Sequence, residues 1–228
     1  MFSIAIETTS RNGSVALGAE GQVRRQIPFD AAYRHAAELL GRLDELLSSE
    51  GLDPRDVSEV YCSVGPGSFT GTRIGVVVAR TLAQAVPGLR LVAVPTALAV
   101  ALAAETLPAR HVAYVLDARE GEVWAQLFDR KGAIFEPTGS GGIGPPEALL
   151  DAAPRPLTLL GEGLTRMDLP ALTAGDERLT VGPEALWYPA AEAVWRVGHR
   201  LATAGQITPP TELGAVYVRR PAAERNAR

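Results

Sequence analysis

The sequence feature that most constrains the fold is a glycine-rich stretch, Ser63–Val76, with the sequence SVGPGSFTGTRIGV. It follows the apolar run Val57–Val64 and leads directly into the helix-forming run Ile74–Val86. Glycine adopts positive φ and proline stiffens a turn, so the stretch predicts a sharp corner between a buried strand and a helix. A corner of this kind is a place where a ligand or another chain segment comes close to the backbone.

The glycine-rich stretch permits two interpretations. Free N–H groups at a helix start attract anions and Arg73 adds a charge, which would make Gly67, Ser68 and Thr70 a nucleotide or anion site. Equally, the hydroxyls cap the helix and the glycines form a tight corner that lets another helix pack closely. Gly71 is not followed by the Lys-Ser/Thr of a P-loop, and the glycine that a nucleophile elbow requires before Ser68 is missing, so neither motif is present.

Length, charge and cysteine content limit the classes of protein to which this chain can belong. The 228 residues are 46% hydrophobic, enough for one large core or two modest ones, and we expect two lobes. The net charge of −4 argues against tight unaided binding of nucleic acid. The single cysteine, Cys62, lies in an apolar strand and is expected to be a buried, inert thiol. A strand-like start, MFSIAIE, and the short, proline-interrupted apolar run Leu91–Ala104 predict a cytoplasmic protein that does not enter a membrane.

Hydrophobic periodicity and turn residues predict an α/β fold with the element order βββαβαβα in the first half. After Pro108 a similar series begins. In both halves a strand ends in a carboxylate, Glu7 or Asp117, and a short turn leads through a glycine into a second strand. The shared pattern predicts an internal duplication, with an N-terminal lobe at residues 1–105 and a smaller, loop-rich lobe at residues 106–228 that includes a helix at Ala190–Thr203.

The polar residues at the strand ends support more than one role. If the lobes are paired, Glu7 and Asp117 would face a cleft, where a carboxylate orients water on a magnesium-bound phosphate or acts as a base. Each acid alone is equally well explained as a cap on its own turn, and Thr8 is a contact for phosphate or for the same turn. The histidines are far apart in the sequence and Cys62 has no partner, so no metal site is predicted.

Two helices carry more apolar positions than one buried face needs. The first has leucines at 39, 40, 43, 46 and 47, and the helix after the glycine stretch has Ile74, Val77, Val78 and Leu82. Most of these side chains are expected in the core, and the surplus suggests a subunit interface. The basic residues near the end, Arg219, Arg220, Arg225 and Arg228, are expected to form a solvated terminus.

Four stretches of the chain resemble a known family. They are IAIETTSRNGSVAL, SVGPGSFTGTRIGV, LDAREGEVWAQLF and AVYVRRP. Together they are similar to the bacterial tRNA threonylcarbamoyladenosine biosynthesis proteins called TsaB or YeaZ, over nearly the whole chain. The resemblance implies an actin/Hsp70/sugar-kinase-like (ASKHA) fold of two related lobes.

The resemblance also implies a function. Members of this family are non-catalytic scaffolds that bind and activate TsaD, the subunit that transfers threonylcarbamoyl to the adenosine beside the anticodon, and the ATPase TsaE joins them. It implies a homodimer when the protein is alone, contact with tRNA only through the complex, and no cofactor of its own, with ATP or ADP at the interface left open. Carried over by position, the interface residues are His35, Leu39, Leu43, Leu46, Arg73, Ile74, Val77 and Arg80.

Two departures separate this chain from catalytic relatives. Those relatives hold a metal through a His-x-x-x-His pair, which this sequence lacks, and their first strand commonly ends in Asp-Thr rather than the Glu7-Thr8 found here. The longer side chain displaces the carboxylate and weakens the case for ATP hydrolysis. The alternative is an enzyme, either a kinase-like phosphotransferase that uses Glu7 and Asp117 or a glycoprotease-like hydrolase.

Overall fold

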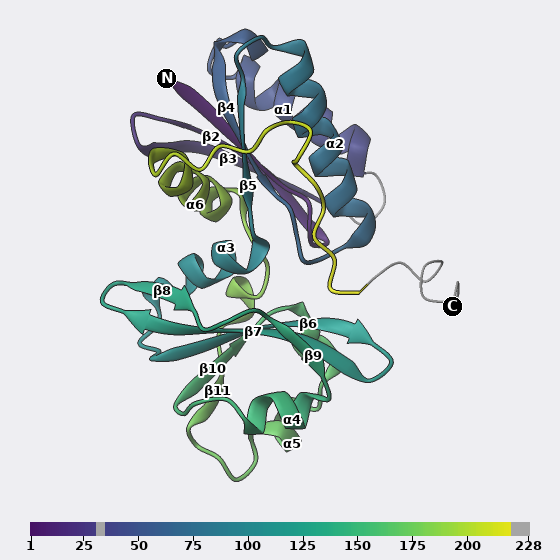
Figure 1. Cartoon of the computed structure of the whole chain (residues 1–228), viewed down its shortest axis with the longest axis vertical. Coiled ribbons are helices and arrows are strands. Elements are labelled where there is room, and N and C mark those ends of the chain that lie inside the picture. Colours follow the sequence, from purple (N-terminus) through teal and green to yellow (C-terminus); the bar gives the residue numbers. More distant parts are fainter. Residues whose placement is uncertain (31–34, 220–228) are drawn as a thin grey trace. The chain divides into compact units, whose positions relative to one another are not determined.

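The computed structural model describes residues 1–30 and 35–219, without the side chains of residues 35 and 36. The chain forms two compact units (Figure 1). Of the described residues, the N-lobe contains Met1–Ala99 and Pro189–Val216, and the C-lobe contains Val100–Tyr188 and residues 217–219. The structure therefore corrects the predicted division at residues 105 and 106, because a long C-terminal segment returns to the N-lobe.

The N-lobe is built on a five-stranded sheet in the order β3-β2-β1-β4-β5. Strand β1 pairs antiparallel with β2 and parallel with β4, which in turn pairs parallel with β5. The strands are β1 (Phe2–Glu7), β2 (Asn12–Ala19), β3 (Gln22–Asp30), β4 (Val57–Ser63) and β5 (Arg90–Val94). The helices are α1 (His35–Ser48), the 3₁₀ turn η1 (Pro54–Asp56), α2 (Phe69–Ala85), α3 (Thr96–Ala103) and α6 (Ala191–Thr203). The predicted order βββαβαβα is confirmed.

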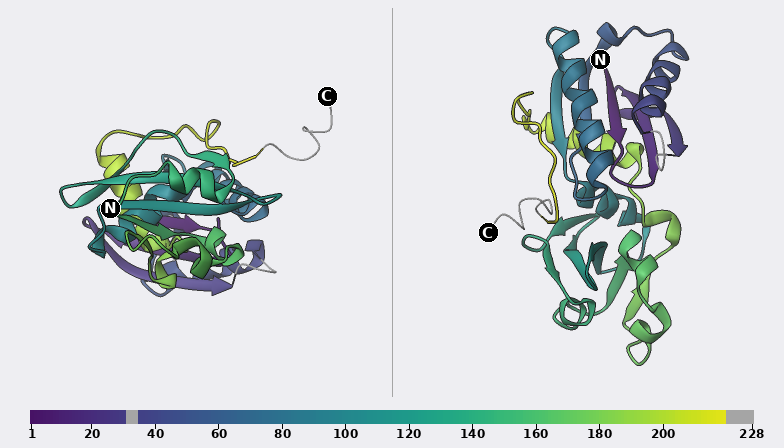
Figure 2. Two further views of the ribbon diagram at one scale, coloured as in Figure 1. Left: turned by 90° about the horizontal axis from the view of Figure 1, so that it is seen from below. Right: turned by 90° about the vertical axis from the view of Figure 1, so that its right-hand side faces the viewer.

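The two faces of the N-lobe sheet are covered by different parts of the chain. Helices α1 and α2 cover one face, and the apolar side chains beneath them form a continuous core that includes Ile6, Leu17 and Val60. Helix α6 covers the other face (Figure 2). Its Trp195 is buried, stands edge-on to Tyr61 at 6.0 Å between ring centroids, and leaves no space for a side chain at Gly18. This packing explains why α6 belongs to the N-lobe.

The C-lobe repeats the strand arrangement of the N-lobe. Its sheet has the order β11-β10-β6-β7-β8, with β9 pairing with β7. The strands are β6 (His111–Arg119), β7 (Glu122–Lys131), β8 (Ile134–Pro137), β9 (Gly142–Gly144), β10 (Leu157–Leu160) and β11 (Leu179–Val181). The helices are α4 (Pro146–Asp151), α5 (Leu169–Thr173) and the 3₁₀ turns η2 (Ala104–Thr106), η3 (Glu162–Arg166) and η4 (Glu184–Leu186).

Matched strand by strand, the two sheets have the same topology. Strands β6, β7, β8, β10 and β11 take the places of β1, β2, β3, β4 and β5, with the same parallel and antiparallel neighbours. The internal duplication predicted from the sequence is confirmed, as is an α/β fold of two related lobes with mixed sheets flanked by helices. Among the helices of the described residues, none has the length and apolarity to cross a bilayer.

Candidate functional site

The glycine-rich stretch forms a closed corner at the end of β4. Gly65 has a φ of +102°, which a residue with a side chain rarely adopts, and Gly67 lies so close to the carbonyl oxygen of Thr9 that a Cβ atom would not fit. The N–H of Ser68 donates to that same carbonyl over 2.6 Å. The glycines therefore allow the backbone to lie directly against the turn between β1 and β2.

The polar groups of this corner bond within the protein. Ser68 caps α2, since its Oγ accepts from the N–H of Gly71 over 3.2 Å, and its carbonyl accepts from the N–H and the hydroxyl of Thr72. The N–H of Thr96 donates to the carbonyl of Gly65 over 2.9 Å. With this cap, α2 begins at Phe69, before the helix-forming run Ile74–Val86 identified in the sequence. These bonds favour the interpretation of the stretch as a structural corner.

The strand-end carboxylates act as caps on their own turns. Glu7 is completely buried, and its Oε1 accepts from the backbone N–H and, over 2.7 Å, from the hydroxyl of Thr9. Thr8 is also buried and donates its hydroxyl to the carbonyl of Gly71 over 2.8 Å. Asp117 is exposed on the C-lobe, where its Oδ1 accepts from the N–H of Arg119 over 2.7 Å. In each acid, one carboxylate oxygen thus caps the turn that follows its own strand.

The C-lobe contains a second glycine corner, which the sequence analysis missed. Gly161 follows β10 as Gly65 follows β4, and it has a φ of +117°. Two residues on, Gly163 lies against the backbone of Leu116 and Asp117 without room for a Cβ, as Gly67 lies against Thr9. The signal was a Gly-x-Gly directly after a strand in both halves. Since the corner recurs, it is a part of the repeated fold.

The apolar residues assigned to the partner interface on α1 require a correction. Leu39 and Leu46 are completely buried and Leu43 is 5% exposed, because these leucines pack on the N-lobe sheet. They form the core of the N-lobe, so the surplus apolar surface inferred from the leucine stripe is reduced to Leu40. The side chain of His35 lies outside the described residues.

Helix α2 does carry exposed apolar surface. Val77 is 60% exposed and Phe69 is 43% exposed, and on α1 Leu40 is 54% exposed. The guanidinium of Arg73 lies 4.7 Å from the centre of the Phe69 ring and is itself exposed. Ile74 and Arg80, the other interface residues assigned to α2, are partly exposed. We call Leu40, Phe69, Arg73 and Val77 the α1–α2 surface.

A small apolar groove lies beside this surface, between α1 and α2. It has a volume of about 170 Å³. Leucine and valine side chains line most of it, with Asp44 as its one charged lining residue; they are Leu40, Leu43, Leu47, Leu52, Val57, Val60, Leu82, Val86 and Leu89. The groove is large enough for one apolar side chain of a partner and offers almost no polar chemistry.

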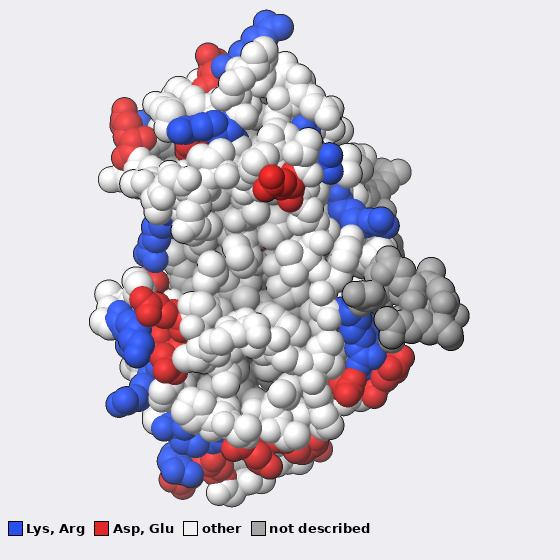
Figure 3. Space-filling model, viewed as in Figure 1, with Lys and Arg blue, Asp and Glu red and all other residues white. Residues whose placement is uncertain are grey.

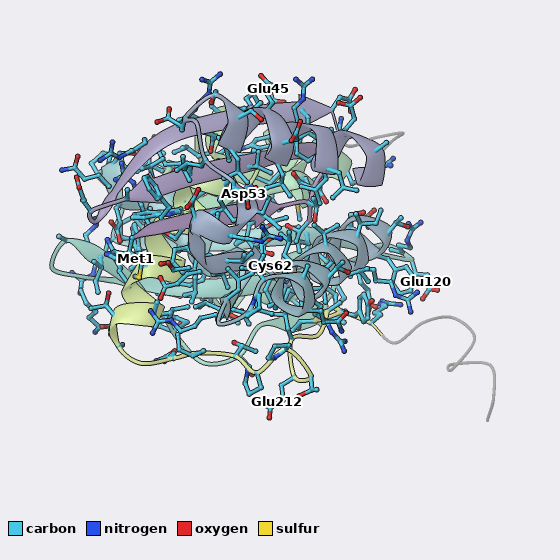
Figure 4. All side chains as sticks on the ribbon, turned by 90° about the horizontal axis from the view of Figure 1, so that it is seen from above. Met1, Glu45, Asp53, Cys62, Glu120 and Glu212 are labelled. Carbon is cyan, nitrogen blue, oxygen red and sulfur yellow. The ribbon has the colours of Figure 1, made fainter. Side chains whose placement is uncertain are left out.

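The sequence has a single thiol, that of Cys62. Cys62 is completely buried beneath the helices (Figure 4), and burial together with the negative charge of Glu7 raises the pKa of its thiol, so the expectation of an inert thiol is confirmed. Within residues 1–30 and 35–219, no group of three or more His, Cys, Asp or Glu side chains is arranged to hold a metal.

The C-terminal segment also requires a correction. Arg219 is held by two carboxylates of the turn between β6 and β7, with 2.7 Å to Glu120 and a second, short contact to Glu122. It is therefore not part of a solvated terminus. Of the other basic residues in that prediction, Arg220, Arg225 and Arg228 lie outside the described residues.

Comparisons with known proteins place this architecture in a family. Residues 23–170 match the family model described as TsaD: tRNA N6-adenosine threonylcarbamoyltransferase. The tRNA threonylcarbamoyladenosine biosynthesis protein TsaB of Escherichia coli is 32% identical over 168 residues, which are 72% of this chain and 70% of that protein. TsaB of Bacillus subtilis is 31% identical over 142 residues, which are 60% of this chain but only 58% of that protein.

A solved structure supports the same assignment at the level of the fold. YeaZ from Pseudomonas aeruginosa superposes with a TM-score of 0.80 at 24% identity, covering 95% of this chain and 99% of that chain. The fold of this protein is thus the fold of YeaZ. From the extent of the family-model match and of the match to the E. coli protein, the chain belongs to the TsaB (YeaZ) family.

Proposed function

We propose that this protein takes part in the biosynthesis of threonylcarbamoyladenosine in tRNA, as a non-catalytic subunit that binds and activates a TsaD-type transferase. The names of its relatives in E. coli and B. subtilis support the process. The observation that supports the subunit role is the exposed α1–α2 surface, which lies beside an apolar groove. The polar groups at the strand ends of the same lobe form hydrogen bonds within their own turns.

The proposal of a non-catalytic role rests on how the polar groups are used. A transferase or a kinase needs a carboxylate or a backbone N–H cluster that faces its substrate. Here Glu7 is buried against Thr9, Thr8 bonds to Gly71, and Ser68 caps its own helix. Opening this corner to a nucleotide would break these bonds, so the N-lobe is better suited to present α2 than to bind a phosphate at its base.

The α1–α2 surface has the composition expected of a protein interface. Aromatic residues and arginine are enriched at the centre of such contacts, whose buried core is largely apolar. Phe69 and Val77 provide the apolar area, Arg73 provides a cation held over the Phe69 ring, and the adjacent groove accepts an apolar side chain. In the proposed assembly this surface contacts the TsaD-type subunit, and in its absence a second copy of the chain.

The other components of the proposal come from the family. A TsaE-type ATPase joins the complex, ATP or ADP binds only where subunits meet, tRNA contacts the protein only within the complex, and the assembly is cytoplasmic. The net charge of −4 supports the indirect contact with tRNA, because an acidic protein attracts a polyanion weakly.

The experiment that tests this function is co-elution with the TsaD-type subunit from the same source. The variant Val77→Glu places a charge at the most exposed apolar position of α2 and should weaken the complex by about a hundredfold or more. The matched control is Ile143→Glu, which charges an exposed isoleucine on the C-lobe and should leave the complex intact. Both positions are exposed, so neither variant should unfold the chain.

A second measurement is the amount of threonylcarbamoyladenosine in cellular tRNA. Cells depleted of the protein should lose threonylcarbamoyladenosine from their tRNA, and the Val77→Glu variant should not restore it. A complex that forms equally well with Val77→Glu would rule out the α1–α2 surface as the interface. Normal levels of the modified nucleoside in depleted cells would rule out the proposed function as a whole.

A further inference from the structure

A polar pocket on the C-lobe lies where the chain enters β6 and leaves β7. It is an open pocket of about 600 Å³ lined by residues 108–111 and 129–132. Its charged side chains are Arg110, Arg130, Lys131 and Asp129, and His111 also lines it. Three cations and one carboxylate give this spot a positive balance, whereas the whole chain is acidic, with a net charge of −4.

Within the described residues, Arg130 is held in place by neutral groups. Its Nε donates to the carbonyl of Ala109 over 2.7 Å, and a terminal nitrogen donates to the carbonyl of Leu107 over 2.6 Å. Its guanidinium also lies 4.3 Å from the centre of the Phe135 ring. Carbonyl oxygens and an aromatic face orient the cation but leave its charge uncompensated.

The histidine in the pocket is oriented as well. Nδ1 of His111 lies 2.6 Å from Oδ1 of Asp129, and the His111 side chain is only 12% exposed. Because Nδ1 is engaged by the carboxylate, Nε2 is the ring nitrogen left for a ligand. The pocket contains no serine or cysteine, so the His-Asp pair has no nucleophile to activate.

The two remaining cations are exposed at the rim. Neither Arg110 nor Lys131 forms a salt bridge within the described part of the chain, and Lys131 is the only lysine in the sequence. The neighbouring carboxylate is Glu136, which lies opposite Asp129 in the β7–β8 ladder and does not line the pocket. Elsewhere on the C-lobe face in Figure 3, cationic and acidic side chains are interspersed.

We propose that this pocket binds a phosphate group through Arg110, His111, Arg130 and Lys131. Arginine and lysine side chains are donors that recognise phosphate oxygens, and the guanidinium of Arg130 is already oriented by its hydrogen bonds. The phosphate belongs either to the backbone of an RNA or to a free mononucleotide or inorganic phosphate. The site is separate from the α1–α2 surface and does not depend on the proposed partner.

The single lysine allows a direct test in the full-length protein. Reductive methylation with ¹³C-formaldehyde retains the positive charge and labels two groups, Lys131 and the chain's amino terminus. Titration with inorganic phosphate at constant ionic strength should shift the Lys131 signal in a saturable manner and leave the N-terminal signal unchanged. Arg110→Gln should weaken this binding by about tenfold, since a hydrogen bond to a charged group is lost. The control is Arg196→Gln, an exposed cation of α6 that should have no effect.

Two further arms distinguish the source of the phosphate. If the site binds RNA, an anticodon stem-loop will shift the same signal at far lower concentration than phosphate does, with an affinity that falls steeply with salt. If it binds a small molecule, AMP or phosphate will saturate the signal and the RNA will not compete. A shift that chloride reproduces at equal ionic strength, or one that Arg110→Gln leaves unchanged, overturns the proposal.

Discussion

The two lobes have the same sheet and different helices. Both place a central strand between an antiparallel pair and a parallel pair, in the same order. In the N-lobe, α1 has 14 residues and α2 has 17, whereas their counterparts α4 and α5 in the C-lobe have 6 and 5. The two lobes thus share their strands and differ in the length of their helices.

The space between the paired helices differs in the same way. The groove between α1 and α2 is small and apolar, with about 170 Å³ lined mainly by leucine and valine. The corresponding pocket at α4 and α5 has about 590 Å³ and is lined by charged residues that include Glu147, Arg166, Asp168 and Asp176. Only the N-lobe groove is suited to burying an apolar side chain, which is why the proposed interface is on that lobe.

The glycine corners show which feature the lobes retain. In both, a glycine with positive φ comes within two residues of the end of the fourth strand of the repeat, and a second glycine two residues later lies against the backbone at or just after the end of the first strand. The segments after the corners differ, since Ser68 caps the long α2 and Gly163 continues into the short turn η3. The corner therefore turns the chain at the end of a strand. Its sequence resembles that of a ligand-binding loop because glycines are needed where two backbone segments approach closely.

The largest expected effect comes from filling the two corners. Gly67→Ala and Gly163→Ala each place a Cβ against backbone atoms that have no room to move, and each should lower the free energy of unfolding by about 2–3 kcal/mol. The measurement is denaturant unfolding of the whole chain. Gly142→Ala is the control, because a Cβ there meets nothing within 4 Å. If one corner tolerates alanine and the other does not, the corners are not equivalent.

Local patterns in the sequence predicted the elements and the duplication. Strand alternation, helix periodicity and the strand-carboxylate-turn-glycine pattern depend on residues close together in the chain, and the structure confirms the element order and the second lobe. The glycine stretch predicted a corner correctly because only a corner needs both positive φ and the absence of a Cβ at that spacing.

These local sequence patterns did not predict contacts between residues that are far apart in the chain. Helix α6 was predicted as a helix but assigned to the wrong lobe, because its position depends on Trp195 packing over Gly18 and Tyr61, far away in the sequence. Most leucines of α1 were predicted in the core, but the surplus assigned to an interface included Leu39, Leu43 and Leu46, because a sequence does not reveal how wide a sheet lies beneath a helix. Arg219 was assigned to a solvated terminus because its partners, Glu120 and Glu122, precede it by about a hundred residues.

The next largest effect is expected from a substitution on the exposed face of α1. Gly41 lies in the middle of α1, is exposed, and has nothing within 4 Å of a Cβ. Gly41→Ala should raise the free energy of unfolding by up to about 1 kcal/mol, because glycine is a poor helix former. If a partner helix packs closely on this face, the same variant should weaken the complex with the TsaD-type subunit. Weaker binding of a more stable chain would place Gly41 in the interface, and unchanged binding would place it outside.

The smallest expected effect is on the melting temperature, and it comes from charged groups in the C-lobe loops, where the N-lobe has apolar packing. A hydrogen bond from Arg155, followed by bonds from Arg178, lowers the pKa of Asp176 below its ordinary value of 3.8. A carboxyl group with a depressed pKa stabilises the fold when ionised, so this contribution is present at neutral pH and is lost as the pH falls through the depressed pKa. Asp176→Asn should therefore lower the melting temperature slightly at pH 7, with a difference that shrinks as the pH falls below 3.8.

The companion variant removes the donor from the same contact. Arg155→Gln should lower the melting temperature at pH 7, and in its presence Asp176→Asn should cost less than it does alone, because the two residues share one hydrogen bond of 2.8 Å. Calorimetric melting at pH 7 and at a strongly acidic pH measures both effects. If Asp176→Asn lowers the melting temperature equally at both pH values, the charge of the carboxylate does not stabilise the C-lobe loops. Polar contacts in the C-lobe would then not compensate for apolar packing such as that between α1 and α2.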